Sequence, residues 1–298
     1  MTKPKRLEVS LKTRFLGLGL GLLLAAAASL PAAAETPIER GAYLVEGIAN
    51  CGNCHAPQEP SGAVPLTPLS GGPAIPSPVF TAYPPNITPD RETGIGTWTE
   101  PDIVTALREG HTPDGRTLRP PMPIQFYRSM SDQDAHAIAA YLLSRPPVAH
   151  RSPPPHYKFP APASYGPPLA QVTAPPDTDR TAYGGYLASM GHCMLCHTPP
   201  GPNGQRDYDH RLGAGGLAMD GVFGHIVTPN ITPDKQTGIG TWSDADITRV
   251  LTTGERPDGR HLASPMPIAY LAHLTPGDRT ALVAWLRSLP PVHNPVNR

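Results

Sequence analysis

Hydrophobic residues at three- and four-residue spacing predict a long helix near the end of each half of the chain. The first set is Ala135, Ile138, Ala139 and Leu142, and the second is Leu282, Trp285, Leu286 and Leu289. Two prolines follow each set, at 146–147 and 290–291. Because proline cannot continue a helix, both helices are predicted to end before these pairs.

Two more helices are predicted in each half. First helices are expected over about 37–49 and 181–190. The middle helices begin at two N-cap signatures, Thr-Glu-Pro-Asp at 99–102 and Ser-Asp-Ala-Asp at 243–246. Serine and threonine are common N-caps because their side-chain oxygens accept hydrogen bonds from the first backbone N–H groups.

Long loops separate the first and middle helices. They cover 56–85 and 198–229 and are rich in proline and glycine. Loops of this length are uncommon in compact domains unless they have a functional role. No strand is strongly indicated, so the predicted fold class is mainly α with long loops.

The two halves repeat each other in sequence, which predicts two tandem domains over 35–150 and 179–298. Residues 151–178, between them, hold nine prolines and are predicted to form a semi-rigid linker. Two copies are too few for a solenoid. The recurring motifs are Asn-Ile-Thr-Pro-Asp (86–90 and 230–234), Thr-Gly-Ile-Gly-Thr-Trp (93–98 and 237–242), Asp-Gly-Arg (114–116 and 258–260) and Pro-Met-Pro (121–123 and 265–267).

Residues 1–34 are predicted to be a secretory signal peptide. A basic start precedes an apolar run over 15–30, and three alanines at 32–34 form a small-residue cleavage pattern. The run is shorter than the about 20 residues that a membrane-spanning helix needs. No later stretch is apolar enough to span a bilayer. The mature chain is therefore expected in the periplasm without a transmembrane helix, and an uncleaved N-terminal anchor is the alternative.

The balance of 24 basic and 24 acidic residues changes once this leader is set aside. The leader carries five basic residues and one acid, which leaves 19 against 23 and a net charge of −4. A nucleic-acid-binding protein would show a basic face, so nucleic acid is not an expected partner. Aromatic residues make up only 6% of the chain, few for two hydrophobic cores built from side chains alone.

All four cysteines belong to two copies of one motif. The copies are Cys51-Gly52-Asn53-Cys54-His55 and Cys193-Met194-Leu195-Cys196-His197. C-x-x-C-H is the attachment site of c-type haem, because two thiols one helical turn apart form thioethers with the vinyl groups and the adjacent histidine ligates iron. The alternative, a Cys-x-x-Cys zinc site or dithiol switch, requires the histidine by coincidence twice. We therefore expect two covalently bound haem c groups, with His55 and His197 as iron ligands.

Met122 and Met266 are the predicted sixth ligands of the two irons. They lie at matched positions inside Pro-Met-Pro, 67 and 69 residues after His55 and His197. No other histidine or methionine recurs in this way, and His192 is interpreted as a surface or loop residue. The alternative is that both methionines are ordinary core residues. His/Met ligation raises the reduction potential and fills the coordination sphere, which favours electron transfer over catalysis.

Other matched residues leave two interpretations open. Trp98 and Trp242 either donate an indole N–H to a haem propionate or belong to the core. Arg116 and Arg260 either offset propionate charge or are solvated.

These repeated motifs resemble those of the c-type cytochrome subunits of bacterial membrane-associated alcohol, aldehyde, gluconate and sorbitol dehydrogenases. Similar cytochromes accompany molybdenum hydroxylases. The resemblance implies class I cytochrome c-like domains, each built around one haem, and Met122 and Met266 as axial ligands. Those subunits typically hold three haems and many have a C-terminal membrane-binding segment, whereas two haem motifs and a polar tail at 292–298 are seen here.

The resemblance further implies an electron-transfer protein rather than an enzyme. A dehydrogenase is the expected electron donor, and another cytochrome or an oxidase is the expected acceptor. The alternative is a dihaem redox enzyme of the peroxidase kind. It would need one iron open to substrate, whereas the two predicted sites are alike.

Overall fold

The computed structural model describes residues 34–57, 68–202, 204–221, 224–262 and 264–296, together with Thr2. Contacts divide the chain into two units, Met1–Ala34 and Glu35–Arg298, and all that follows concerns the second. Apart from Thr2 and Ala34, the predicted signal peptide (1–34) lies outside the described residues. No helix in the described part of the chain is long and apolar enough to cross a membrane.

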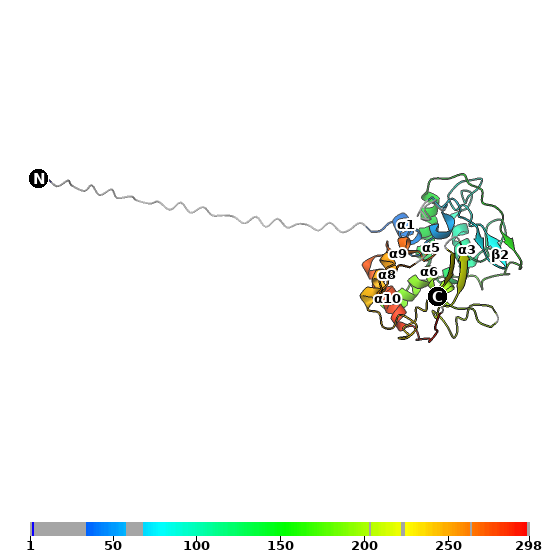
Figure 1. The fold of residues 1–298 in the computed structure, drawn as a ribbon. Coiled ribbons are helices and arrows are strands. Elements are labelled where there is room, and N and C mark those ends of the chain that lie inside the picture. Colours follow the sequence, from blue (N-terminus) through cyan, green and yellow to red (C-terminus); the bar gives the residue numbers. More distant parts are fainter. Residues whose placement is uncertain are drawn as a thin grey trace. The chain divides into compact units, whose positions relative to one another are not determined.

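Both repeats carry the same order of elements (Figure 1). The first repeat contains α1 (Pro37–Val45), α2 (Gly52–His55), β1 (Ile75–Pro76), β2 (Phe80–Ala82), α3 (Glu100–Glu109), α4 (Ile124–Tyr127) and α5 (Asp132–Ser144). The second contains α6 (Arg180–Met190), α7 (Cys193–His197), β4 (Ala218–Gly221), β5 (Gly224–Val227), α8 (Asp244–Thr253), α9 (Ile268–Leu271) and α10 (Pro276–Ser288). Strand β3 (His156–Tyr157) lies in the linker.

Polar side chains begin the middle helices, as the sequence predicts, and also the last helices. Each of these side chains accepts a hydrogen bond from a backbone N–H in the first turn of its helix. The four N-caps are Thr99, Ser131, Ser243 and Thr275. The middle helices α3 and α8 end at Gly110 and Gly254, where φ is 73° and 74°. Only glycine adopts this left-handed conformation without steric cost, so both helices end at matched positions.

Helices account for 33% of the described residues and strands for 8%. The strands were not indicated by the sequence. β1, β2 and β3 form a small antiparallel sheet, and β4 pairs with β5. Strands of two to four residues are too short to show an alternating pattern.

The first and last helices of each repeat cross at a glycine. A Cβ on Gly41 would lie 2.0 Å from the carbonyl oxygen of Ala137, and one on Gly184 would lie 1.9 Å from that of Ala281. A side chain larger than hydrogen has no room at either crossing. The two glycines therefore let α1 pack against α5, and α6 against α10, at close range.

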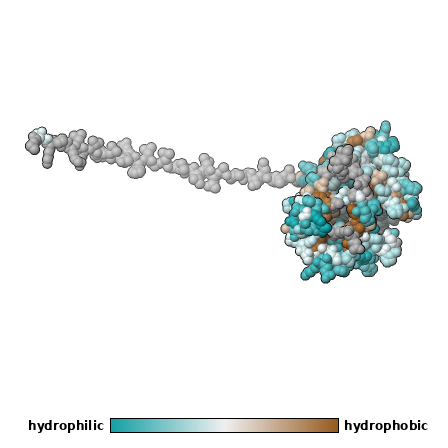
Figure 2. Space-filling model, in the orientation of Figure 1, coloured by the Kyte–Doolittle hydropathy of each residue, from teal (hydrophilic) through white to brown (hydrophobic). Residues whose placement is uncertain are grey.

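One hydrophobic core runs through both repeats. It contains Leu44 and Ile138 of the first repeat together with Leu187 and Leu282 of the second, each at most 3% exposed. Hydrophilic residues cover much of the face seen in Figure 2, and hydrophobic ones show mainly toward its middle. Because the core is shared, the boundaries at 35–150, 151–178 and 179–298 stay predictions.

Two matched tyrosines cross between the repeats to the start of a last helix. The hydroxyl of Tyr186 on α6 donates to Asp134 Oδ2 (2.6 Å) and accepts from the backbone N–H of Ser131 (3.1 Å). The hydroxyl of Tyr43 on α1 donates to Asp278 and accepts from the backbone N–H of Thr275 (3.0 Å). Each repeat thus contacts the other through the same surface.

The proline-rich linker packs against the first repeat. The Tyr157 hydroxyl donates to the Pro120 carbonyl (2.8 Å), and the Tyr165 hydroxyl donates to the Leu118 carbonyl (2.9 Å). Both acceptors lie just before the Pro-Met-Pro motif of this repeat. The linker therefore lies beside the segment that carries Met122.

Candidate cofactor site

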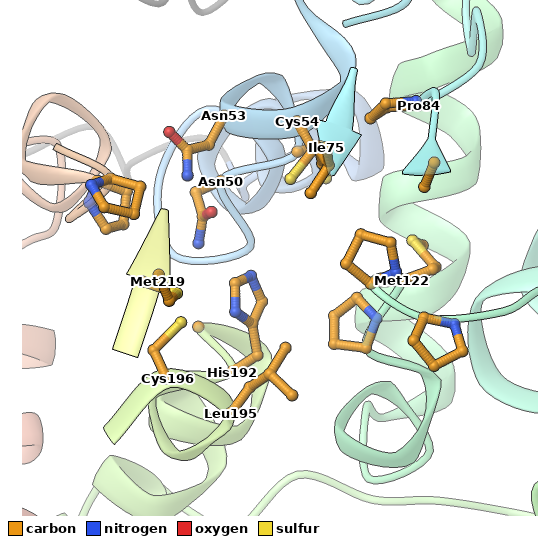
Figure 3. A pocket seen from close by; sticks show the side chains of 18 of the residues that line it. Asn50, Asn53, Cys54, Ile75, Pro84, Met122, His192, Leu195, Cys196 and Met219 are labelled. Atoms are coloured by element: carbon orange, nitrogen blue, oxygen red, sulfur yellow. The ribbon is translucent and has the colours of Figure 1, made fainter. Parts of the chain in front are cut away.

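A cavity of about 3020 Å³ is lined by residues of both repeats. Pockets for drug-sized ligands usually measure about 300–1,000 Å³, so this one has room for more than one large prosthetic group. Its lining includes all eight residues that the sequence singles out, which are Cys51, Cys54, His55, Met122, Cys193, Cys196, His197 and Met266. Figure 3 shows part of this lining, with Cys54 and Cys196 supplied by different repeats.

The two C-x-x-C-H motifs form the one-turn helices α2 and α7. The residue before each first cysteine has a left-handed backbone, with φ of 39° at Asn50 and 41° at His192. This conformation is uncommon for residues other than glycine, and asparagine and histidine tolerate it better than most. The chain therefore turns sharply into each motif at the same place.

None of the four thiols forms a disulfide. Burial raises the pKa of Cys51 and of Cys193 to about 12 and that of Cys54 to about 11. A reactive dithiol requires a thiolate, which such burial disfavours. The described residues also contain no cluster of three or more acidic, histidine or cysteine side chains that could hold a metal ion. The burial of the thiols therefore argues against the dithiol alternative.

Each motif histidine is oriented by a proline carbonyl. His55 Nδ1 lies 2.8 Å from the Pro85 oxygen, and His197 Nδ1 lies 2.9 Å from the Pro229 oxygen. A carbonyl accepts a hydrogen bond from Nδ1–H, so this contact selects the tautomer whose Nε2 carries the lone pair that binds a metal. Burial also lowers the pKa of His55, which keeps the imidazole neutral.

Met122 and Met266 lie between the middle helix and the following one-turn helix of their repeats. Both are partly buried and pack against the core that the repeats share. Figure 3 shows Met122 at the cavity. Just after each methionine, the N–H of Ile124 donates to the Met122 carbonyl (3.0 Å) and that of Ile268 donates to the Met266 carbonyl (2.9 Å). Each methionine is therefore joined directly to the start of α4 or α9.

One buried cation in the cavity has an unpartnered nitrogen. Arg256 is only 17% exposed, and its guanidinium lies 6.0 Å from the centre of the Trp242 ring and 3.1 Å from Asp258. Its Nε is buried without a hydrogen-bond partner among the described residues. A buried N–H of this kind is costly unless an acceptor meets it, and the propionate of a haem is such an acceptor. With the thiols, the oriented imidazoles and the apolar walls, Arg256 fits a haem in this cavity.

The other matched residues are placed differently. Trp98 and Trp242 line the cavity and are partly buried against the hydrophobic core. Arg116 and Arg260 are 68% and 67% exposed and pair with the aspartates two residues before them. Arg116 also lines the cavity, whereas Arg260 does not, so the exposure supports the solvated interpretation for Arg260.

Sequence reasoning missed several residues of the cavity. Pro85 and Pro229 act through their backbone oxygens, and their only signal was their place before the matched Asn86 and Asn230. His192, which the sequence places on the surface or in a loop, lies in the turn before α7, where it lines the cavity (Figure 3) and burial lowers its pKa to about 4. An unmatched histidine gives no sign of this, because its ring contact, Tyr127, lies in the other repeat.

Comparison with known proteins finds similarity to c-type cytochromes. The Cytochrome c family model matches residues 38–146. The fructose dehydrogenase cytochrome subunit of Gluconobacter japonicus is 34% identical over 87% of this chain and 54% of its own length. The gluconate 2-dehydrogenase cytochrome c subunit of Pantoea cypripedii is 32% identical, over 92% and 64%. The chain thus spans between half and two thirds of these subunits.

A shorter relative is matched over most of its length. The diheme cytochrome c-type protein of Cereibacter sphaeroides is 32% identical over 81% of this chain and 82% of its own length.

Proposed function

The chain belongs to the cytochrome c family, and from that premise we propose that it is a periplasmic dihaem electron carrier. Family membership implies covalently bound haem c, and the dehydrogenase cytochrome subunits among its relatives imply electron transfer. The proposal adds that a partner dehydrogenase supplies electrons one at a time. It also adds that another cytochrome or an oxidase of the respiratory chain receives them.

Two haems are assigned to two tandem class I cytochrome c-like domains, 35–150 and 179–298, behind a signal peptide at 1–34. The thiols of Cys51 and Cys54 would hold one haem, and those of Cys193 and Cys196 the other. The axial ligands would be His55 with Met122 and His197 with Met266. When bound, each haem supplies a one-electron Fe(III)/Fe(II) couple, which no side chain of the protein offers.

One observation carries this proposal. Both complete sets of predicted ligands line a single cavity, and both histidines take the same orientation from matched proline carbonyls. A histidine kept neutral and oriented in this way is prepared to bind iron through Nε2.

The matched methionines also separate the carrier from a peroxidase-like enzyme. An enzyme of that kind needs one iron with an open position. Here Met122 and Met266 lie at equivalent places in both repeats, so both irons would be six-coordinate and low-spin. This pairing favours electron transfer.

The test is spectroscopy of the purified mature chain. Its intact mass and the absorbance of its reduced pyridine haemochrome should both give two haems per chain. The oxidised protein should be low-spin and show the near-infrared band of methionine bound to iron. Met122→Ala and Met266→Ala should each remove about half of this band, since each would unligate one of the two irons.

Met130→Leu is the matched control for these variants. Met130 is fully buried in the core outside the cavity lining, and its counterpart in the second repeat is already a leucine, Leu274. This variant should keep the whole band. High-spin haem in the unmodified chain, together with peroxide turnover, would contradict the carrier assignment.

A further inference from the structure

The one-turn helix that follows Met122 docks on the second repeat. The ring of Phe126 on α4 packs edge-to-face on Tyr208, with centroids 5.7 Å apart and the planes at 83°. The hydroxyl of Ser189 on α6 donates to the Phe126 carbonyl (3.2 Å). The next residue, Tyr127, places its ring 6.3 Å from that of His192. Three contacts to two consecutive residues therefore come from the other repeat.

The helix that follows Met266 makes the reciprocal contact. Leu271 at the end of α9 and Leu274 just after it lie in the same core as Leu44 of the first repeat, and both are at most 4% exposed. Leu274 also lies beside Gly47 of the first repeat. A Cβ added to Gly47 would be 3.8 Å from the Cδ2 atom of Leu274. Tyr270, the counterpart of Phe126, is 1% exposed. The segments after both methionines are thus buried against the opposite repeat.

Movement of α4 would be transmitted directly to Met122. The helix begins two residues after the methionine, and the Ile124 N–H is bonded to the Met122 carbonyl. Within the first repeat, the backbone N–H of Met122 donates a second hydrogen bond, to the Arg119 carbonyl (3.2 Å). The position of the thioether therefore depends on where α4 is held.

We propose that each repeat positions the axial methionine of the other, and that Tyr208 is a positioning residue for Met122. The inference rests on the proposed His/Met ligation. The two haem sites are then not independent electron carriers placed in tandem. The strength of the bond from methionine to iron in the first repeat is set partly by side chains of the second.

The first haem can be observed by itself in the Met266→Ala variant. In this variant only Met122 contributes to the near-infrared band of methionine bound to iron. Imidazole is the probe, because it competes with methionine for ferric iron and binds more tightly when the methionine is released more often. Tyr208→Ala and Phe126→Ala should each tighten imidazole binding to this haem by about two- to tenfold, the range expected for loss of one aromatic pair. The double variant should bind no more tightly than the stronger single one, because both remove the same contact.

Controls and conservative variants keep this result interpretable. His210→Ala changes an 83% exposed residue two positions after Tyr208 and should leave imidazole binding unchanged. Tyr208→Leu and Phe126→Leu keep more of the buried volume, and they replace the alanine variants if these do not fold.

Two results would overturn the inference. One is imidazole affinity at the first haem that stays unchanged in both single variants. The other is single effects that multiply in the double variant, which would show that Phe126 and Tyr208 act separately. Failure of the proposed function looks different. In that case Met122→Ala itself, made in the Met266→Ala background, leaves the spectrum unchanged.

Discussion

Replacing Tyr186 by phenylalanine should destabilise the protein without touching the cofactor site. The change removes one hydroxyl from the contact between the repeats. This hydroxyl donates to the carboxylate of Asp134 and accepts the N–H of Ser131. All three residues are at most 6% exposed, so water cannot readily replace the lost partner.

The expected loss is about 2–3 kcal/mol of unfolding free energy. A hydrogen bond to a charged group contributes roughly 1.5–3 kcal/mol, and a buried donor left without a partner costs about 1–3 kcal/mol. The expected loss of unfolding free energy is smaller than the sum of these two contributions. The reason is that Asp134 keeps both hydrogen bonds from Arg40, at 2.8 and 3.1 Å. In a protein of this size it corresponds to a melting temperature lower by roughly 4–12 °C.

Urea unfolding of the haem-loaded chain, followed by far-ultraviolet circular dichroism, measures this loss. Tyr43→Phe is the matched variant on the other side of the contact. Tyr43 is partly exposed, so its loss should cost only about 1 kcal/mol. The two changes should not add independently, because Arg40 bonds to Asp134 and also lies 5.6 Å from the Tyr43 ring.

Equal losses for the two variants would refute this reasoning, because burial would then not determine the cost. A loss below about 0.5 kcal/mol for Tyr186→Phe would show that the hydroxyl adds nothing to the contact. The absorption spectrum serves as the control and should be unchanged in both variants.

Three further predictions follow from other parts of the structure. Gly184→Ala should destabilise the fold by about 3 kcal/mol or more in urea unfolding, because its Cβ would collide with the Ala281 carbonyl. Gly277→Ala, whose nearest neighbour would be 3.7 Å away, should be close to neutral. Arg256→Gln should lower the reduction potential of the second haem by roughly 40 mV in a redox titration, since losing about 1 kcal/mol of favourable charge interaction stabilises the ferric form. Hydrogen bonds from Ser243 lower the pKa of Asp246 below 3.8. The stability that Asp246 contributes is therefore present above pH 3.8 and is lost as the pH falls below it. Acid unfolding of Asp246→Asn should show a weaker pH dependence below pH 3.8 than acid unfolding of the unmodified chain.

Local patterns predicted the helices well. The N-cap signatures at Thr99 and Ser243 place the middle helices where the structure has them, because a cap depends on residues only three positions apart. The prolines at 146–147 likewise end the last helix of the first repeat as expected. The first helix of that repeat is shorter than predicted and ends at Val45, before the turn that leads to the motif.

Contacts between distant residues could not be read from the sequence. The duplication matched Met122 with Met266, but it did not show that α4 lies against the other repeat. At the cavity, the ring of His192 likewise contacts a ring from the first repeat, that of Tyr127. The proline carbonyls that orient the histidines have no side-chain signature at all. Residue type and spacing therefore predicted the chemistry of the site, whereas its supporting contacts required the fold.

The reciprocal tyrosine contacts also limit how such repeats can assemble. Tyr43 reaches the start of α10, and Tyr186 reaches the start of α5, so the same patch is used twice in opposite directions. This is the geometry of an isologous interface, in which residue i meets j and j meets i. Such an interface is closed by two copies and leaves no equivalent patch for a third. A single repeat could reproduce it only as a homodimer, and fusion of the two copies keeps the pair together at any protein concentration.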